Sequence, residues 1–270
     1  MKLVGYDADG VTMIGGVDAA GDVRALGEIQ QFWRAQNTTS DGPVAGNIKS
    51  LRQRPAVPPT ARVICVGLNY RLHAQEANQP IPQVPVIFAR WAQTLTVDGA
   101  PAPAIEEKFD WEGELGVVIG RRMFRVDEEQ AAKGVFGYAA FNDLSARSFQ
   151  MQTPQWILGK NSDASGPMSA VVTADEVGDP AKGLRITTRV NGETMQDSTT
   201  ADMIFSVPKL IAHLSQVMTL TPGDFIVTGT PSGVGMALGK FLKPGDTVEV
   251  EIENIGVVRT PIVAPPASIA

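Results

Sequence analysis

The fold can be worked outward from FDWEGELGVVIG (residues 109–120), in which an acidic segment runs into an apolar strand. Successive side chains of a strand point to opposite faces, so Glu112 and Glu114 share one face. The apolar residues that follow indicate that this face is partly enclosed. Two enclosed carboxylates raise each other's pKa or require a cation between them. The stretch therefore predicts a buried strand with a positive group beside its beginning.

Other β-branched runs, bounded by Gly, Pro, Asn or Asp, predict strands on both sides of this stretch. They are residues 63–70, 85–91, 134–143, 168–173, 184–193, 224–230 and 246–263. Helical patterns are few and cover residues 71–78, 127–134 and the amphipathic 207–220. Because strands dominate and do not alternate with helices, we expect an α+β fold built on a strand-rich mixed β-sheet roll.

The beginning of the chain predicts a separate small unit. Short strand-like runs precede a short helix at about residues 26–36, which indicates an N-terminal α/β unit. The stretch RQRPAVPPTARV (residues 52–63) contains three prolines and is typical of a stiff linker. We therefore expect a small N-terminal domain over residues 1–58 and a larger domain over residues 59–270.

Composition excludes several classes of partner. The formal net charge of −6 disfavours non-specific binding to nucleic acid or to an anionic membrane, because both require a basic surface. The single cysteine, Cys65, has no internal disulfide partner, so nothing indicates an oxidising compartment. No segment approaches the roughly 20 apolar residues of a membrane span. We expect a cytoplasmic protein that acts on a small molecule.

A third carboxylate completes a candidate metal site. Asp143 ends another apolar strand, and three carboxylates without a nearby Cys or His are typical of Mg²⁺, Mn²⁺ or Ca²⁺ sites. Spacing alone leaves alternatives open, because two glutamates at this spacing are common on solvated strands. Asp143 also fits the N-cap of a helix.

The glycine-rich TGTPSGVGMALG (residues 228–239) lacks the spacing of a dinucleotide-binding loop. Its backbone amides and the Thr230 hydroxyl fit a loop that receives a substrate carboxylate, and a structural turn fits equally well. His73 and Glu76 lie three residues apart, so one helical turn brings them together. A carboxylate raises the basicity of a histidine, which suits a base that deprotonates water; a surface ion pair is the alternative.

Five motifs in this order resemble those of the fumarylacetoacetate hydrolase family, and the resemblance covers roughly residues 60–262. They are GLNYRLHAQE (67–76), FDWEGELGVVIG (109–120), FNDLSARSFQ (141–150), LGKNSDASGP (158–167) and LTPGDFIVTGTPSGVG (220–235). The resemblance implies the fold of that family's C-terminal domain for residues 59–270. It also implies a homodimer.

The resemblance assigns roles to the candidate residues. It implies that Glu112, Glu114 and Asp143 bind one divalent ion, usually Mg²⁺ or Mn²⁺. It implies that His73 and Glu76, on a lid segment, form the dyad that activates water. Further residues follow from the same motifs: catalytic Gln150 and Lys160, and substrate-binding Arg147, Gly229 and Thr230.

The chain departs from the family's pattern after the strand at residues 85–91. Many members have a lysine and a proline there, whereas this chain has Arg90 and Trp91. A guanidinium suits a carboxylate, so Arg90 is a candidate for contact with the substrate or the lid, and a packing ion pair is the alternative. Ser148 also replaces a commonly acidic residue, and both changes bear on substrate specificity.

The expected activity is hydrolytic cleavage of a carbon–carbon bond in a 1,3-diketo acid of the acylpyruvate type, with the metal stabilising the pyruvate enolate. Lys160 and Gln150 would stabilise the oxyanion, while Thr230 and the glycine loop would hold the carboxylate. The alternative is decarboxylation of a 2-oxo diacid such as oxaloacetate, or isomerisation of an unsaturated 2-oxo acid, through the same metal-bound enolate. A binding protein without catalysis is the third alternative, disfavoured because dyad and lysine are present.

Overall fold

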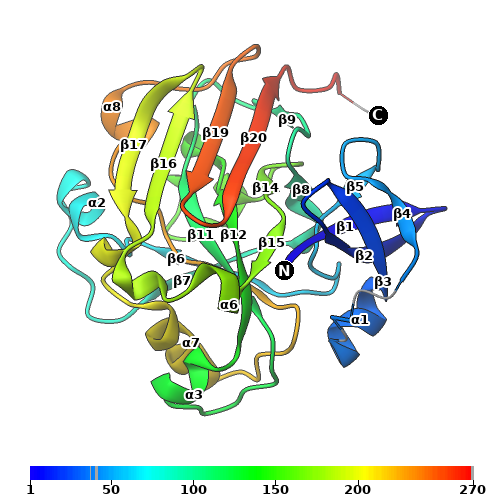
Figure 1. Cartoon of the computed structure of the whole chain (residues 1–270). Helices are drawn as coiled ribbons and strands as arrows, with labels where there is room; N and C mark the ends of the chain where they lie inside the picture. The colour runs from blue at the N-terminus through cyan, green and yellow to red at the C-terminus, as the bar shows by residue number, and fades with distance from the viewer. Residues whose placement is uncertain (37, 40–41, 269–270) are drawn as a thin grey trace.

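The computed structural model describes residues 1–36, 38–39 and 42–268 and shows a strand-rich protein with short helices (Figure 1). The described strands form three sheets, with thirteen, five and two strands. The main path of the largest runs β4-β3-β2-β1-β15-β12-β11-β18-β6-β7, and the five-stranded sheet has the order β17-β16-β19-β20-β9. The α+β class and the mixed β-sheet roll expected from the sequence are confirmed.

The strands of the large sheet are β1 (Lys2–Ala8), β2 (Val11–Val17), β3 (Asp22–Glu28), β4 (Val44–Asn47), β5 (Gln53–Arg54), β6 (Val63–Gly67), β7 (Val86–Arg90), β8 (Leu95–Val97), β11 (Gly113–Ile119), β12 (Val135–Asn142), β14 (Gly166–Met168), β15 (Val171–Thr173) and β18 (Phe225–Val227). The five-stranded sheet contains β9 (Ala102–Pro103), β16 (Arg185–Val190), β17 (Glu193–Thr199), β19 (Thr247–Ile252) and β20 (Gly256–Val263). The third sheet pairs β10 (Phe109–Asp110) with β13 (Ser145–Ala146). The helices are α1 (Ile29–Ala35), α2 (Arg71–Glu76), α3 (Glu128–Ala132), α4 (Arg147–Gln150), α5 (Ile157–Lys160), α6 (Ala174–Val177), α7 (Val207–Ser215) and α8 (Gly235–Leu238), with 3₁₀ turns η1 (Ala92–Thr94), η2 (Pro180–Lys182) and η3 (Thr200–Asp202).

The strand β11 is buried on both faces, as its apolar run predicts. Leu115 and Val117 point to one face and pack in a cluster that includes Val250 of β19. Figure 1 shows the five-stranded sheet lying over β11 and β12 on this side. Val118 points to the other face and belongs to a second cluster. Because side chains alternate, the two glutamates of the opening stretch share the face of Val118, away from the five-stranded sheet.

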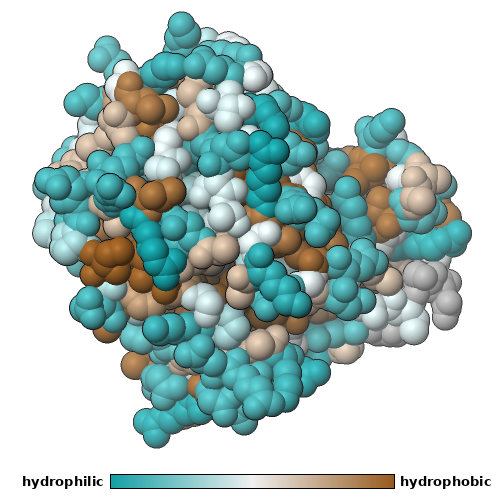
Figure 2. Space-filling view, turned by 60° about the vertical axis from the view of Figure 1, so that its left-hand side comes forward, coloured by the Kyte–Doolittle hydropathy of each residue, from teal (hydrophilic) through white to brown (hydrophobic). Residues whose placement is uncertain are grey.

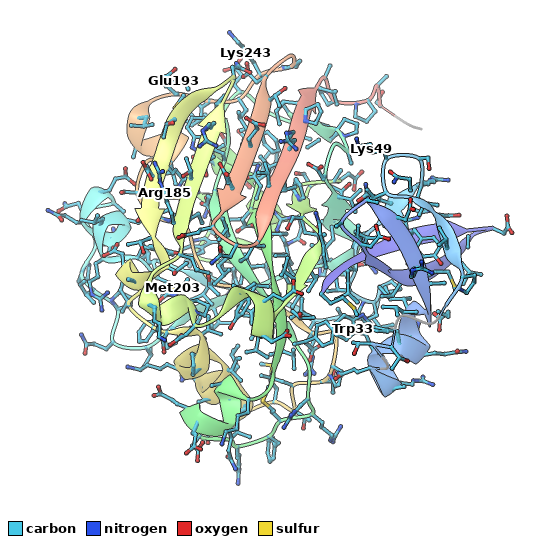
Figure 3. All side chains as sticks on the ribbon, in the orientation of Figure 1. Trp33, Lys49, Arg185, Glu193, Met203 and Lys243 are labelled. Atoms are coloured by element: carbon cyan, nitrogen blue, oxygen red, sulfur yellow. The ribbon has the colours of Figure 1, made fainter. Side chains whose placement is uncertain are left out.

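The N-terminal unit forms a smaller lobe at one side of the molecule (Figure 1, Figure 2). Its strand β1 pairs with β15, so the sheet continues from this lobe into the main body. Trp33 of α1, labelled in Figure 3, makes an edge-on contact with Phe136 and donates a hydrogen bond to the Ala56 carbonyl at 3.0 Å. Ala56 and Val57 are buried, so the proline-rich segment packs in the core and is not an exposed linker. The division near residue 58 stays a prediction.

The helix α7 shows how local sequence sets an element. The Ser206 hydroxyl accepts a hydrogen bond from the Lys209 backbone N–H at its beginning, and Leu210, Ile211 and Leu214 are buried at helical spacing. This apolar stripe joins the cluster beneath β11 and packs near α3. None of the helices in the described part of the chain is long and apolar enough to cross a membrane.

Candidate metal and active site

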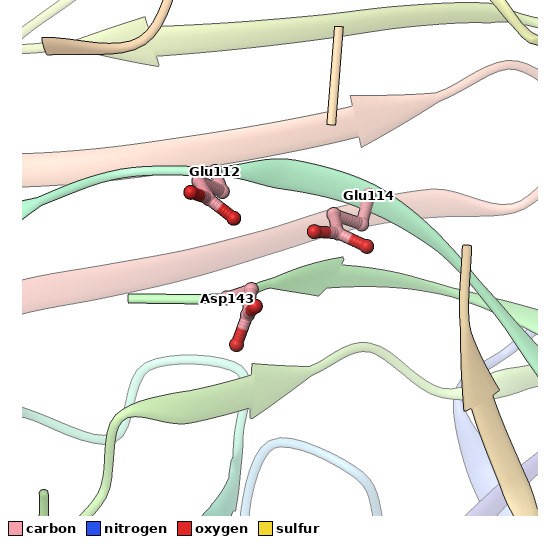
Figure 4. A group of neighbouring side chains, drawn as sticks. All are labelled: Glu112, Glu114 and Asp143. Atoms are coloured by element: carbon pink, nitrogen blue, oxygen red, sulfur yellow. The ribbon is translucent and has the colours of Figure 1, made fainter. Parts of the chain in front are cut away.

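The three predicted metal ligands lie together at the beginning of β11 and the end of β12. Figure 4 shows Glu112 and Glu114 on one strand and Asp143 on its neighbour. The Asp143 backbone N–H donates to the Glu112 carbonyl at 2.8 Å, which fixes the two strands side by side at this point. One carboxylate oxygen from each residue lies within 4.8 Å of the others, and all three residues are buried. This geometry suits a single divalent ion held by oxygen atoms.

Three cations lie among these carboxylates. The Lys160 ammonium contacts Glu112 at 2.6 Å and Asp143 at 2.7 Å. Arg147 contacts Glu112 at 2.6 Å, and Arg90 contacts Asp143 at 2.6 Å. Glu112 and Asp143 therefore each have two cationic partners. The N-cap alternative for Asp143 is wrong, because α4 begins at Arg147 with Ala146 as its N-cap and the Asp143 carboxylate faces cations.

Glu114 differs from its neighbours because the partner recorded for its carboxylate is an uncharged backbone amide, the N–H of Gly229 at 2.5 Å. Burial and the neighbouring Asp143 and Glu112 carboxylates raise the pKa of Glu114 well above its usual value. For Glu112, burial acts in the same direction, but Lys160 and Arg147 outweigh it and lower the pKa to about 2. Glu114 is thus the carboxylate of the three that has no ion pair within the described part of the chain.

This difference between Glu112 and Glu114 is the observation that supports a bound divalent ion. A buried carboxylate with no cation beside it is costly, and an ion bound by all three carboxylates would supply the missing charge. The donor set contains oxygen atoms only, which suits Mg²⁺ or Mn²⁺ and disfavours softer metals. The positive group predicted beside the start of the buried strand is therefore supplied in part by Lys160 and Arg147, and Glu114 is the carboxylate that an ion would neutralise.

The second predicted constellation also forms. His73 Nδ1 lies 3.0 Å from one Glu76 oxygen, and the other Glu76 oxygen accepts the Gly233 N–H at 2.8 Å. The helix α2 that carries both residues is fixed to the end of η3, because Arg71 donates to the carbonyl oxygens of Asp202 and of its C-cap residue Met203. The dyad is thereby held between η3 and the glycine-rich loop.

A cavity of about 500 Å³ joins the two constellations. Eight predicted site residues line it: His73, Glu76, Glu112, Glu114, Arg147, Gln150, Lys160 and Thr230. The remaining lining is largely apolar and includes Val66, Phe88, Met151, Trp156, Val234 and Met236. Sequence reasoning missed these apolar residues, because single hydrophobic side chains beside a motif carry no recognisable pattern.

Arg90 lies behind the ligands and is not part of this lining. Besides contacting Asp143, it donates to the Thr94 and Ser165 hydroxyls and to the Leu144 carbonyl, and its side chain is fully buried. Its donors are used within the protein, so the packing ion pair is the interpretation that fits. Arg90 orients Asp143, and its contact with a substrate stays a prediction.

The glycine-rich loop also acts through protein contacts. Gly229 is not part of the cavity lining, and its N–H donates a hydrogen bond to Glu114. Its φ is 98°, and a Cβ at this position would lie 2.8 Å from the Asn69 Cβ, so the position requires glycine. The Thr230 hydroxyl donates to the Gly113 carbonyl at 3.0 Å and accepts from Gln196 at 2.8 Å. Both residues therefore hold the beginning of β11 in place.

Asp110 is a buried residue that sequence reasoning missed. Its carboxylate accepts from Arg147 Nε at 2.7 Å and from the backbone N–H groups of Gly235 and Met236 at 2.7 and 2.9 Å. Burial raises the pKa of Asp110 despite the guanidinium of Arg147. The signal that could have found it is a carboxylate two residues before Glu112, at the start of the same buried stretch.

Comparison with known proteins agrees with this site. The model of the fumarylacetoacetate (FAA) hydrolase C-terminal family matches residues 62–263, which include both constellations. The chain belongs to this family. The mitochondrial oxaloacetate tautomerase of Bos taurus is 44% identical over 209 residues, which are 75% of this chain and 66% of that protein.

Two solved structures of family members extend the comparison. Fumarylacetoacetate hydrolase from Exiguobacterium antarcticum has a TM-score of 0.84 at 31% identity, with 98% of this chain and 100% of that chain covered. Fumarylpyruvate hydrolase from Pseudomonas aeruginosa, solved in complex with Mn²⁺ and pyruvate, has a TM-score of 0.70 at 31% identity, with 79% and 92% covered. The family thus includes hydrolases and tautomerases, and the resemblance read from the motifs is confirmed.

Proposed function

We propose that this protein is a divalent-metal-dependent hydrolase that cleaves an acylpyruvate-type 1,3-diketo acid into pyruvate and a carboxylic acid. The observation that carries the proposal is that the His73–Glu76 dyad lines the same cavity as Glu112, Glu114 and Lys160. A water activator next to a 2-oxo acid site is needed for hydrolysis, whereas enolate chemistry alone needs no such activator.

The ion would be Mg²⁺ or Mn²⁺, held by Glu112, Glu114 and Asp143. When bound, it supplies Lewis acidity that stabilises negative charge on the 2-oxo acid end of the substrate. Binding of Mn²⁺ and pyruvate by fumarylpyruvate hydrolase of P. aeruginosa supports this choice of ion and of ligand end. The buried carboxylates would hold the ion at the cavity that the dyad also lines.

His73 takes a proton from water in the hydrolytic step. Its Nδ1 is paired with Glu76, so Nε2 is the nitrogen that meets the water. The hydroxide oxygen adds to the distal carbonyl carbon, and the carbon–carbon bond then breaks with its electron pair passing to the pyruvate fragment. Protonation of that fragment gives pyruvate, and the acyl fragment leaves as a carboxylic acid.

Lys160 and Gln150 would stabilise the oxyanion. The Lys160 ammonium is held by two carboxylates, which raise its pKa against the opposing effect of burial and keep it charged. The Gln150 oxygen accepts from Arg147 at 2.9 Å, so its amide N–H₂ is left to donate to the substrate. Both groups line the cavity.

A second candidate function is tautomerisation of oxaloacetate. The 44% identity to the oxaloacetate tautomerase of Bos taurus favours it. This reaction moves a proton between carbon and oxygen and breaks no carbon–carbon bond. Decarboxylation of a 2-oxo diacid is a further outcome of the same enolate chemistry, and His73 would then handle a substrate proton.

Product analysis with purified, Mg²⁺-loaded protein separates these functions. Acylpyruvates and oxaloacetate are incubated separately, with EDTA controls and with a His73→Gln variant that keeps the metal ligands. We expect EDTA-sensitive release of pyruvate and a carboxylic acid, reduced at least about 100-fold in the variant, because general-base catalysis contributes about that factor or more. Intact acylpyruvates beside EDTA-sensitive enol–keto conversion of oxaloacetate would refute the hydrolase.

A further inference from the structure

The charges around the cavity are almost fully committed to one another. Five carboxylates of the described chain lie around the cavity: the buried Asp110, Glu112, Glu114 and Asp143, and Glu76 of the dyad. The permanent cations among them are Arg90, Arg147 and Lys160. Five carboxylates against three permanent cations leave two negative formal charges, which one divalent ion would neutralise. With that ion bound, the site would be balanced before a substrate enters.

Beyond the ligands, the described wall of the cavity carries no permanent cation that lacks a carboxylate partner. Among the described residues that line it, the permanent cations are Arg147 and Lys160, and each contacts two carboxylates. His73, the other basic side chain in the lining, pairs with Glu76. A substrate can place one carboxylate at the ion, whereas a second carboxylate would lie beside acidic groups without a partner.

An apolar wall leads away from the metal ligands. The Lys160 ammonium lies 5.4 Å from the centre of the Phe88 ring, and that ring lies 5.5 Å from the ring of Trp156 in an edge-on contact. Met151 and Met236 also line the cavity and are 63% and 48% exposed. Apolar surface therefore extends from the catalytic ammonium to the solvent, and flexible methionines can adapt to the shape of a bound group.

We propose that the cavity selects 2-oxo acid substrates whose distal end is uncharged and apolar, in preference to dicarboxylates of the same length. This inference rests on the proposed function and adds the chemical class of the acyl group. Phe88, Trp156 and Met236 are its specificity-determining residues. A substrate gains about fourfold in affinity for each methylene of its distal chain that is buried against the apolar wall. A terminal carboxylate on that chain removes part of this gain.

Binding of matched ligands to the Mg²⁺-loaded protein tests this preference without turnover. Calorimetry compares 2-oxohexanoate with 2-oxoadipate, which have six carbons each and differ in a terminal methyl or carboxylate. We expect 2-oxohexanoate to bind at least about tenfold more tightly. Equal or tighter binding of 2-oxoadipate would overturn the substrate class while leaving the metal-bound 2-oxo acid intact. Failure of both ligands to bind in an EDTA-sensitive manner would overturn the proposed function as well.

A charge placed in the wall should reverse part of the preference. Met236→Lys adds an ammonium to the lining, and Leu238→Lys is its matched control, because Leu238 lies on the same helix, is 46% exposed and does not line the cavity. We expect Met236→Lys to improve 2-oxoadipate binding about fourfold, as expected for one solvated charge pair. Leu238→Lys should leave the ratio of the two affinities unchanged. Equal effects of the two variants would overturn the assignment of Met236 to the apolar wall that receives the distal end of the substrate.

Discussion

Removal of the Lys160 ammonium should destabilise the metal-free protein more than the metal-loaded one. The side chain is 2% exposed and joins Glu112 to Asp143 at 2.6 and 2.7 Å. In Lys160→Met, breaking a buried ion pair costs about 3 to 5 kcal/mol of unfolding free energy. Glu112 keeps Arg147 and Asp143 keeps Arg90, so we expect the lower end, about 3 kcal/mol.

Urea unfolding with EDTA and with saturating Mg²⁺ measures this effect. Binding of a divalent ion at about 100 times its Kd stabilises either protein by about 2.7 kcal/mol. Without the competing ammonium the ion should bind the variant more tightly than the wild type, so Mg²⁺ should reduce the difference in stability between the two. Lys133→Met is the matched control, because Lys133 contacts Glu129 at the same 2.6 Å but both side chains are mostly exposed. Such a surface pair contributes about 0.3 to 0.5 kcal/mol. Equal losses in the two variants, or a Lys160→Met loss that Mg²⁺ leaves unchanged, would refute the reasoning.

Two further predictions follow from the site. At a pH below the raised pKa of Glu114, Mg²⁺ binding should release a proton from this residue, so the affinity for Mg²⁺ should rise by up to about tenfold per pH unit and then level off. Calorimetry in buffers of different ionisation enthalpy measures the number of protons released. Glu114→Gln should abolish both the binding of Mg²⁺ and the release of the proton. Gly67→Ala places a Cβ 2.3 Å from the Trp156 ring, which must shift, so affinity for 2-oxohexanoate should fall about tenfold. Adding Trp156→Ala removes that clash, so in this background Gly67→Ala should cost nothing further in the same titration.

The central strands could be predicted because their sequence is locally decisive. The β11 run is apolar on both faces and β12 contains one valine and three aromatic residues, so burial and strand formation agree there. The strand β17 was missed because its sequence, ETMQDST, is polar and has little strand propensity. It forms through pairing with β16 along its length, which is a tertiary effect that a local pattern does not report.

The site was predictable where a motif holds two residues close in sequence. The His73–Glu76 pair needs one helical turn, and Glu112 and Glu114 need strand alternation. The hydrogen-bond partners of Arg90 and Thr230 could not be predicted, because they are distant in sequence. Arg90 donates to Asp143, and Thr230 accepts from Gln196. The apolar wall has the same origin, since Phe88 and Trp156 meet through the packing of separate elements.

The difference between the two glutamates of the opening stretch links the fold to the proposed chemistry. Both lie on one face of one strand, yet Glu112 has Lys160 and Arg147 beside it whereas Glu114 has the Gly229 amide. Cations supplied by the chain thus orient two ligands in advance and leave one carboxylate in need of charge. A divalent ion bound beside Glu114 would add only the positive charge that the protein does not supply there. The centre then has little capacity for a second substrate carboxylate, which is why the metal site and the apolar wall of the cavity belong to one arrangement.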